Sequence, residues 1–189
     1  MYPFVRLLKE HVKFRNAPPM GLFDTHVSDH LCWPWDIDPW MELNNGRTLT
    51  LYDLGRMPFS TRIGMFRAMR ANGWSMAVAG NTTRYRRRVR MFHRVTITSR
   101  LLGWDHRFLY VEQAMWRRGE ALNHILMRLA ATDEDGIVPP EKLIVAMGHP
   151  EHPSPQMPHW VDEWVKADSQ RPWPPVVSPP AGSPSAVSP

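Results

Sequence analysis

Four segments in a row, in the middle and second half of the chain, have the composition of β-strands. They are rich in Val, Ile, Thr, Tyr and Trp, which suit a pleated surface. They cover residues 74–89, 94–104, 108–117 and 121–131. Turn sequences such as Arg118-Gly119 separate them. This part of the chain therefore predicts an antiparallel meander of four strands.

A helix is expected before these strands, over residues 44–57. Asn44 or Asn45 can cap its start, because an asparagine side chain accepts hydrogen bonds from the first free amides of a helix. Tyr52 has the spacing of an inward-facing position, and Pro58 is expected to end the helix.

Three further elements complete the expected layout. A first strand is predicted over residues 25–35, a second helical piece over 60–71 and a short closing helix over 139–148. One strand, a helical region and four strands describe an antiparallel sheet with a helix packed on one face. The predicted fold class is therefore α+β.

The length of 189 residues fits one domain with added segments. We predict an N-terminal helix and loop over residues 1–23, a domain over 24–148 and an extension over 149–189. The extension is rich in Pro and Trp, and from about residue 168 it has the composition of a disordered tail.

The composition excludes several classes of protein. No apolar run approaches the roughly 18 residues that a membrane-spanning helix requires, and the first residues lack the pattern of a signal peptide. A single cysteine, Cys32, fits a reducing compartment. The predicted location is the cytoplasm, and the formal net charge of +5 favours phosphorylated partners.

Residues 1–15 predict a short amphipathic basic helix. Apolar residues such as Phe4 and Leu8 are set among Lys9 and Lys13. Such a helix can lie on an anionic membrane, which would make the protein membrane-peripheral. Packing on its own domain is the favoured alternative.

The richest candidate site runs from residue 36 to residue 56. Asp36 and Asp38 close the first strand, and Asn45 and Gly46 open the helix that follows. This order puts a carboxylate beside the positive end of a helix dipole, where a carbonyl oxygen can be polarised. Chemistry on an ester or thioester suits such a site.

The same residues carry a family resemblance. Asp36-Ile-Asp38, followed by Leu43-Asn44-Asn45-Gly46-Arg47, resembles the hotdog-fold acyl-CoA thioesterases, the superfamily of 4-hydroxybenzoyl-CoA thioesterase and the acyl-ACP thioesterases. Further matches extend the resemblance over about residues 24–148, closest to the thioesterase-superfamily-member branch. It implies an antiparallel sheet wrapped around a long helix, and a homodimer with its active sites at the subunit interface. An acyl-CoA or acyl-carrier-protein thioester is the implied substrate, hydrolysed without a cofactor.

The resemblance also implies roles for residues. Asp38 matches the carboxylate that serves as general base or nucleophile, and the amides near Asn45 and Gly46 are the expected oxyanion hole. Trp40 and Tyr52 line the acyl tunnel or belong to the core.

The chain departs from the family pattern at two positions. Glu42 stands where a histidine is usual, and Thr48 stands near the place of a tyrosine. These departures favour the alternative to an enzyme, a non-catalytic acyl-CoA-binding or scaffold protein of the same fold. A membrane-associated protein is a second alternative, favoured by the basic N-terminal helix and the Trp-rich C-terminal segment.

A row of arginines is the candidate binding site for the phosphates of coenzyme A. Arg84, Arg86 and Arg88 are two residues apart, so on a strand they share one face. Guanidinium groups bind phosphate in bidentate fashion, but positive charge also protects the edge of a sheet. Both readings stay open, and nucleic acid is not an expected partner because no known nucleic-acid motif accompanies the run.

No metal is expected. The nine histidines show no zinc-ligand spacing and the chain has no pair of cysteines. The single Cys32 is read as a packing residue rather than a nucleophile paired with His26 or His30.

Overall fold

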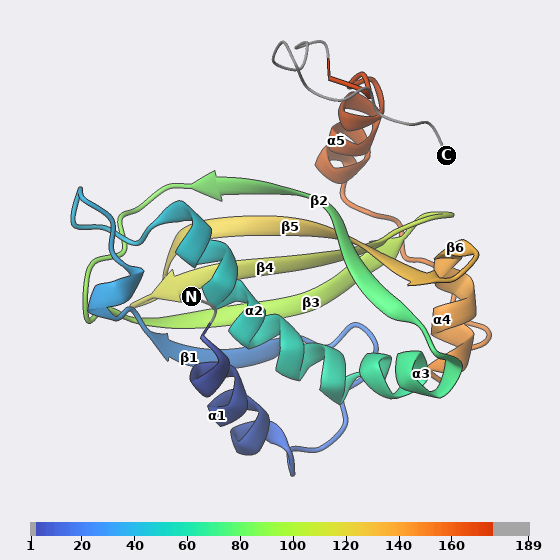
Figure 1. Cartoon of the computed structure of the whole chain (residues 1–189), viewed down its shortest axis with the longest axis horizontal. Helices are drawn as coiled ribbons and strands as arrows, with labels where there is room; N and C mark the ends of the chain where they lie inside the picture. The colour runs from blue at the N-terminus through green and yellow to red at the C-terminus, as the bar shows by residue number, and fades with distance from the viewer. Residues whose placement is uncertain (1–2, 176–189) are drawn as a thin grey trace, which may run out of the picture. The chain divides into compact units, whose positions relative to one another are not determined.

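The computed structural model describes residues 3–175 and divides the chain into two compact units, Met1–Pro155 and Gln156–Pro189 (Figure 1). The helix α5 (His159–Ser169) belongs to the second unit. Because α5 continues to Ser169, the tail expected from about residue 168 begins as helix. The rest of that prediction, from residue 176 onward, lies outside the described residues, and the predicted domain boundaries stay predictions.

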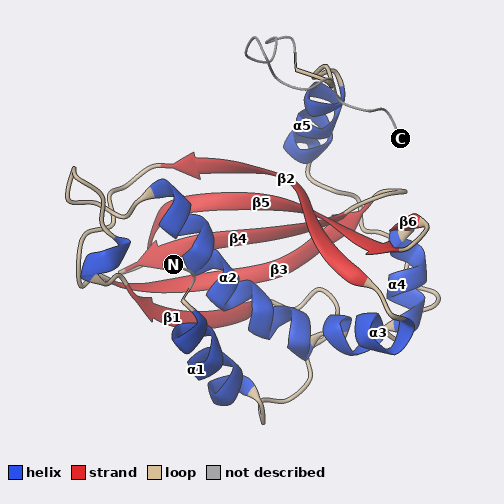
Figure 2. Ribbon diagram, in the orientation of Figure 1, coloured by secondary structure: helices blue, strands red, loops and turns tan. Residues whose placement is uncertain are grey.

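The first unit is built on one antiparallel sheet (Figure 2). Five strands run in the order β1-β3-β4-β5-β2, and a short β6 (Gly136–Val138) pairs with β5. Their bounds are His26–Leu31 (β1), Ser75–Tyr85 (β2), Arg94–Trp104 (β3), Leu109–Arg117 (β4) and Glu120–Asp133 (β5).

The predicted meander of four strands is wrong in one respect. The strands β3, β4 and β5 do follow one another as neighbours, but β2 lies at the far edge beside β5, and β1 takes the place next to β3. Residues 86–93 form the long connection that carries the chain from β2 to β3 on the other side of the sheet. Such a crossing leaves no signal in the composition of the strands themselves.

The helix α2 (Asn45–Arg62) lies across one face of this sheet, as Figure 1 shows. At Gly55 an added Cβ atom would stand 2.9 Å from Cγ2 of Ile97 and 3.1 Å from Oγ of Ser99, both on β3. A glycine is required there because helix and sheet approach too closely for a side chain. The predicted sheet with a long helix on one face is thus confirmed.

The prediction that Pro58 ends this helix is wrong. Pro58 is buried inside α2, which runs on to Arg62, and its neighbour Phe59 is fully buried in the core. Burial of that helical turn compensates for the hydrogen bond that proline cannot donate. The break comes instead at Gly64, whose φ of +83° is left-handed, and α3 (Met65–Asn72) follows it.

Two predicted strands are shorter than expected. The strand predicted to end at residue 35 ends at Leu31, and Pro34–Asp36 forms a 3-10 turn. The strand predicted to end at residue 89 ends at Tyr85, because the amides of Arg86 and Arg87 both donate to the carbonyl of Leu122 and the ladder stops.

The helices α1 (Phe4–Phe14) and α4 (Pro140–Ala146) match their predictions, while the helical piece predicted over residues 60–71 begins only at Met65. The helix α1 packs beside α2, as the favoured reading of the N-terminal segment expects, and α4 closes the domain. Across residues 3–175, none of the helices has the length and apolar content to cross a membrane.

Candidate active site

The start of α2 is capped by Asn44, one of the two asparagines expected there. Its Oδ1 accepts hydrogen bonds from the amides of Gly46 at 2.9 Å and Arg47 at 3.2 Å. The Gly46 amide, expected in the oxyanion hole, is therefore engaged by the cap. Asn45 is the first residue of the helix and is exposed.

Asp36 has the structural role expected of it. Its carboxylate is fully buried and binds Arg6 of α1 and Arg47 of α2, each at 2.8 Å, and the amide of Trp33 at 3.0 Å. One carboxylate thus fixes two helices to the turn that precedes the site.

Asp38 and Glu42 are joined in one tight loop. The Asp38 amide donates to the Glu42 carbonyl at 2.8 Å, and the Glu42 amide donates back to Oδ1 of Asp38 at 3.3 Å. Oδ1 also accepts from the amide of Trp40 at 2.9 Å. The Asp38 carboxylate is half-buried. In the described part of the chain, Oδ1 accepts both of the hydrogen bonds that this carboxylate receives.

The place of Trp40 in an acyl tunnel stays a prediction. Its side chain is 75% exposed at the tip of the loop, next to Met41, which has a φ of +60°. The loop turns so sharply there that Trp40 points away from the core, a geometry that the sequence does not reveal.

A pocket of about 240 Å³ opens beside the start of α2. It brings together residues from the loop, the helix, the end of β2 and β5: Glu42, Leu43, Asn45, Thr48, Tyr85, Arg86, Arg87, Arg88, Val89 and Asn123. Three of the predicted site residues, Asn45, Arg86 and Arg88, are in this lining. The acid that lines the pocket is Glu42 rather than Asp38, its neighbour in the loop.

The arginines reach the pocket for a reason other than the predicted one. Only Arg84 belongs to β2, while Arg86 and Arg88 lie in the loop after it. The prediction that the three arginines share one face of a strand is therefore wrong. All three are exposed, and Nε of Arg88 lies 3.1 Å from Oε2 of Glu42. The loop presents Arg86 and Arg88 to the pocket, together with Arg87.

Tyr52 is buried in the core, and its hydroxyl is hydrogen-bonded to Asn123, a residue that lines the pocket. The hydroxyl donates to Oδ1 of Asn123 at 2.5 Å, and burial raises the pKa of Tyr52, which keeps it a donor. Asn123, which sequence reasoning missed, is an inward-facing amide on β5, whose next inward residues are Ile125 and Met127. A lone amide in an apolar row was the available signal.

The structure also places the single cysteine. Cys32 is fully buried, and burial raises the pKa of its thiol to about 11, which suits packing. Over residues 3–175 no three His, Cys, Asp or Glu side chains gather as a metal site requires. The expectation of a reaction without a metal stays a prediction.

Comparison with known sequences agrees with the geometry. Residues 32–165 match the model of the thioesterase-like superfamily. Protein THEM6 of Xenopus laevis is 34% identical over 166 residues, which cover 86% of this chain and 78% of that protein. Protein THEM6 of Drosophila melanogaster is 27% identical over 146 residues, 76% of this chain and 74% of that protein.

Solved structures show the same fold. The probable thioesterase YbaW of Escherichia coli superposes with a TM-score of 0.61 at 18% identity, over 66% of this chain and 97% of that one. A 1,4-dihydroxy-2-naphthoyl-CoA thioesterase of Synechocystis superposes with a TM-score of 0.57 at 9% identity, over 69% and 100%. These likenesses concern the fold alone, and they confirm the predicted hotdog fold.

Proposed function

Because the chain belongs to the thioesterase-like superfamily, we propose that the pocket at the start of α2 binds an acyl thioester and that the thioester is hydrolysed there. The observation that carries the proposal is the composition of this one pocket. A helix amino end, a carboxylate and a row of guanidinium groups line it together, at Asn45, at Glu42 and at Arg86 to Arg88.

A carboxylate of the loop activates water. It takes a proton from the water as the oxygen bonds to the carbonyl carbon, the C–S bond breaks, and the leaving thiolate takes up that proton. Asp38 is the proposed base, or the nucleophile that forms an anhydride before water cleaves it. Glu42 is the other candidate: its carbonyl accepts from the Asp38 amide, its own amide donates to Oδ1 of Asp38, and it lines the pocket.

The carbonyl oxygen of the substrate is polarised from the helix side. The amide of Asn45 stands at the positive end of the α2 dipole, and Asn123 of β5 is part of the same pocket lining. The amide of Gly46 joins only if the substrate displaces the Asn44 cap.

The arginines are the proposed contact with the phosphates of coenzyme A or of the carrier-protein arm. Arg86 and Arg88 are exposed, so their guanidinium groups are hydrated and can exchange water for phosphate oxygens. Glu42 partners Arg88 at 3.1 Å, so a phosphate that binds Arg88 competes with the very acid that lines the pocket.

A homodimer is the proposed assembly. Within the described chain, β2 is an edge strand that pairs on one side with β5, and its Val78 is 52% exposed. An edge strand can pair with a second copy, and Tyr85 at the end of β2 would bring that copy to the rim of the pocket.

Thioester hydrolysis on a panel of acyl-CoAs tests the proposal. We expect turnover by the natural chain, and a fall of about 10²- to 10⁴-fold in kcat for Asp38→Asn with acyl-CoA binding retained. Glu42→Gln tests the second carboxylate in the same assay, and the larger loss identifies the base. Asp135→Asn, the same change in an exposed hairpin, is the matched control.

The outcome that contradicts hydrolysis is specific. A folded protein that binds acyl-CoA but turns over no acyl-CoA and no acyl-carrier protein would be a binding protein. Glu42 and Thr48, the departures from the family pattern, would then mark the loss of activity.

A further inference from the structure

The helix α1 has its apolar side exposed, whereas an ordinary surface helix has its apolar side buried. Its exposed side is apolar: Phe4, Val5, Leu8 and Val12 are 70%, 83%, 62% and 52% exposed. Its side toward the protein carries Glu10, which is only 1% exposed. A helix whose outer face meets only water places charged residues outward and apolar residues inward.

Charged contacts fix this orientation. Arg6 binds the buried Asp36 at 2.8 Å and the carbonyl of Leu31 at 2.9 Å. Glu10, buried one turn further along the same side, lies 3.5 Å from Nζ of Lys9. Because Arg6 is held inward by Asp36, α1 cannot rotate to bury its apolar side without breaking a buried ion pair.

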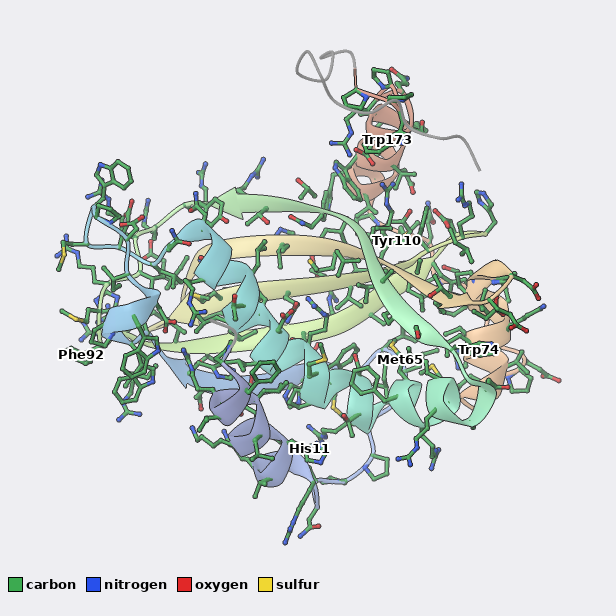
Figure 3. The ribbon with its side chains drawn as sticks, viewed as in Figure 1. His11, Met65, Trp74, Phe92, Tyr110 and Trp173 are labelled. Carbon is green, nitrogen blue, oxygen red and sulfur yellow. The ribbon has the colours of Figure 1, made fainter. Side chains whose placement is uncertain are left out.

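The apolar surface extends beyond the helix. A groove of about 660 Å³ is lined by residues of α1, α2 and α3, among them Leu7, Met57 and Phe66. His11 of α1, labelled in Figure 3, also borders it. The groove continues the apolar side of α1, since Phe4, Val5 and Leu8 also line it, and contiguous apolar surface marks sites of interaction with proteins or membranes.

Aromatic residues adjoin the first turn of α1. Asp36, the partner of Arg6, ends the 3-10 turn that contains Trp35, which is 63% exposed. Trp35 stacks on Trp33 with ring centroids 5.1 Å apart. Phe92 approaches Trp33 at 6.5 Å, and its exposed ring stands at the loop end of the sheet in Figure 3. Tryptophan at such an edge is typical of the boundary between lipid and water.

Positive charge borders the apolar face. Lys9 and Lys13 follow Val5 and Val12 around the helix, and the Lys9 side chain is 71% exposed. An apolar stripe bordered by lysines complements a surface of acyl chains beneath anionic headgroups.

We propose that α1 docks this protein in the plane of a bilayer that contains anionic lipids. Phe4, Val5 and Leu8 enter the boundary of the acyl chains, and Lys9 and Lys13 meet lipid phosphates. The helix lies in the surface, because its 11 residues are too few to span a bilayer. This inference does not depend on the proposed hydrolysis.

Co-sedimentation of the full chain with vesicles tests the proposal. We expect binding to phosphatidylcholine vesicles that contain about 30% phosphatidylglycerol, weaker binding to phosphatidylcholine alone, and a loss of binding at high salt. Val5→Ser/Leu8→Ser should lower the partition coefficient about tenfold or more, and Lys9→Gln/Lys13→Gln should lower it only on anionic vesicles.

The controls separate docking from misfolding and from self-association. Ile137→Ser/Val145→Ser removes two exposed apolar side chains elsewhere and should leave binding unchanged. Unfolding curves establish that each variant is folded. The proposal is overturned if the natural chain does not bind anionic vesicles, if Val5→Ser/Leu8→Ser binds as well as it does, or if that variant instead converts an oligomer to monomers.

Discussion

The helices α1 and α2 have different sequence patterns, and in neither helix does the pattern predict which side chains are buried. Apolar residues gather on one side of α1, yet that side faces outward and Glu10 faces inward. In α2 polar and apolar residues are mixed, and nevertheless Thr48, Arg56 and Ser60 are all buried with its apolar residues. The comparison teaches that the periodicity of a helix does not by itself show which of its sides packs against the protein.

Partners explain how Arg6 beneath α1 and the polar side chains beneath α2 come to be inside. Gln113 of β4 donates to the carbonyl of Tyr52 at 2.9 Å and to Oγ of Ser99 at 2.8 Å, beneath α2. Arg56 binds Asp53 within the helix. Beneath α1, Asp36 supplies the partner for Arg6. A buried polar group is tolerated where it is bonded, so composition alone misjudges which side faces inward.

Removing the carboxylate that both helices share should have the largest effect. Asp36→Ala leaves two guanidinium groups, those of Arg6 and Arg47, without their buried partner, and we expect a loss of about 3–5 kcal/mol in the free energy of unfolding. Urea unfolding measures it, with Asp135→Ala as the exposed control. A loss below about 1 kcal/mol would mean that α1 and α2 are held by apolar packing alone.

Acid should destabilise the layer beneath α1. Burial, and then the charge of Arg62, lowers the pKa of His26 to about 4, and burial and then Arg6 lower the pKa of His30 to about 3. In the unfolded chain both protonate near pH 6.5, so the unfolded state binds more protons as the pH falls below that value. We expect stability to fall by about 2–3 kcal/mol per pH unit around pH 5.

Urea unfolding at a series of pH values between 7.5 and 4.5 measures this slope. The variant His30→Gln should lose about half of this pH dependence, and His26 should account for the other half. Stability that stays constant, or rises, as the pH falls from 6.5 to 5 would contradict the burial of these two neutral imidazoles.

The smallest of these effects tests how closely α2 lies on the sheet. In an exposed helix, Gly→Ala stabilises by about 1 kcal/mol. At Gly55 the new methyl group would meet Ile97 at 2.9 Å, so we expect a destabilisation of about 1–3 kcal/mol. Thr50→Ala on the exposed side of the same helix is the control, measured by thermal unfolding. A stabilised Gly55→Ala variant would show that the helix can move away from β3 freely.

Much of the fold could be predicted because local signals were strong. β-branched and aromatic segments gave the strands β3, β4 and β5, and Asn44 gave the start of α2. Pro58 misled because its missing donor is a local cost, while the burial of Phe59 is a gain that only the packed core supplies.

The candidate site was predicted in part. Asn45, Arg86 and Arg88 do line one pocket at the start of α2, while the catalytic role of Asp38 stays a prediction. The sequence did not reveal that Glu42 rather than Asp38 lines the pocket, that Trp40 points outward, or that Asn123 reaches the site from β5. Each of these depends on the turn of a loop or on a pairing between distant segments.

The sequence by itself determined the types of the elements, the cap of the main helix and the family, because these are recorded in neighbouring residues. The tertiary structure alone decided the order of the strands, the side of α1 that faces outward and the acid that lines the pocket. These depend on contacts between residues far apart in the chain, such as Arg6 with Asp36 and Tyr52 with Asn123. Such contacts form only when the whole sheet has closed around its helix.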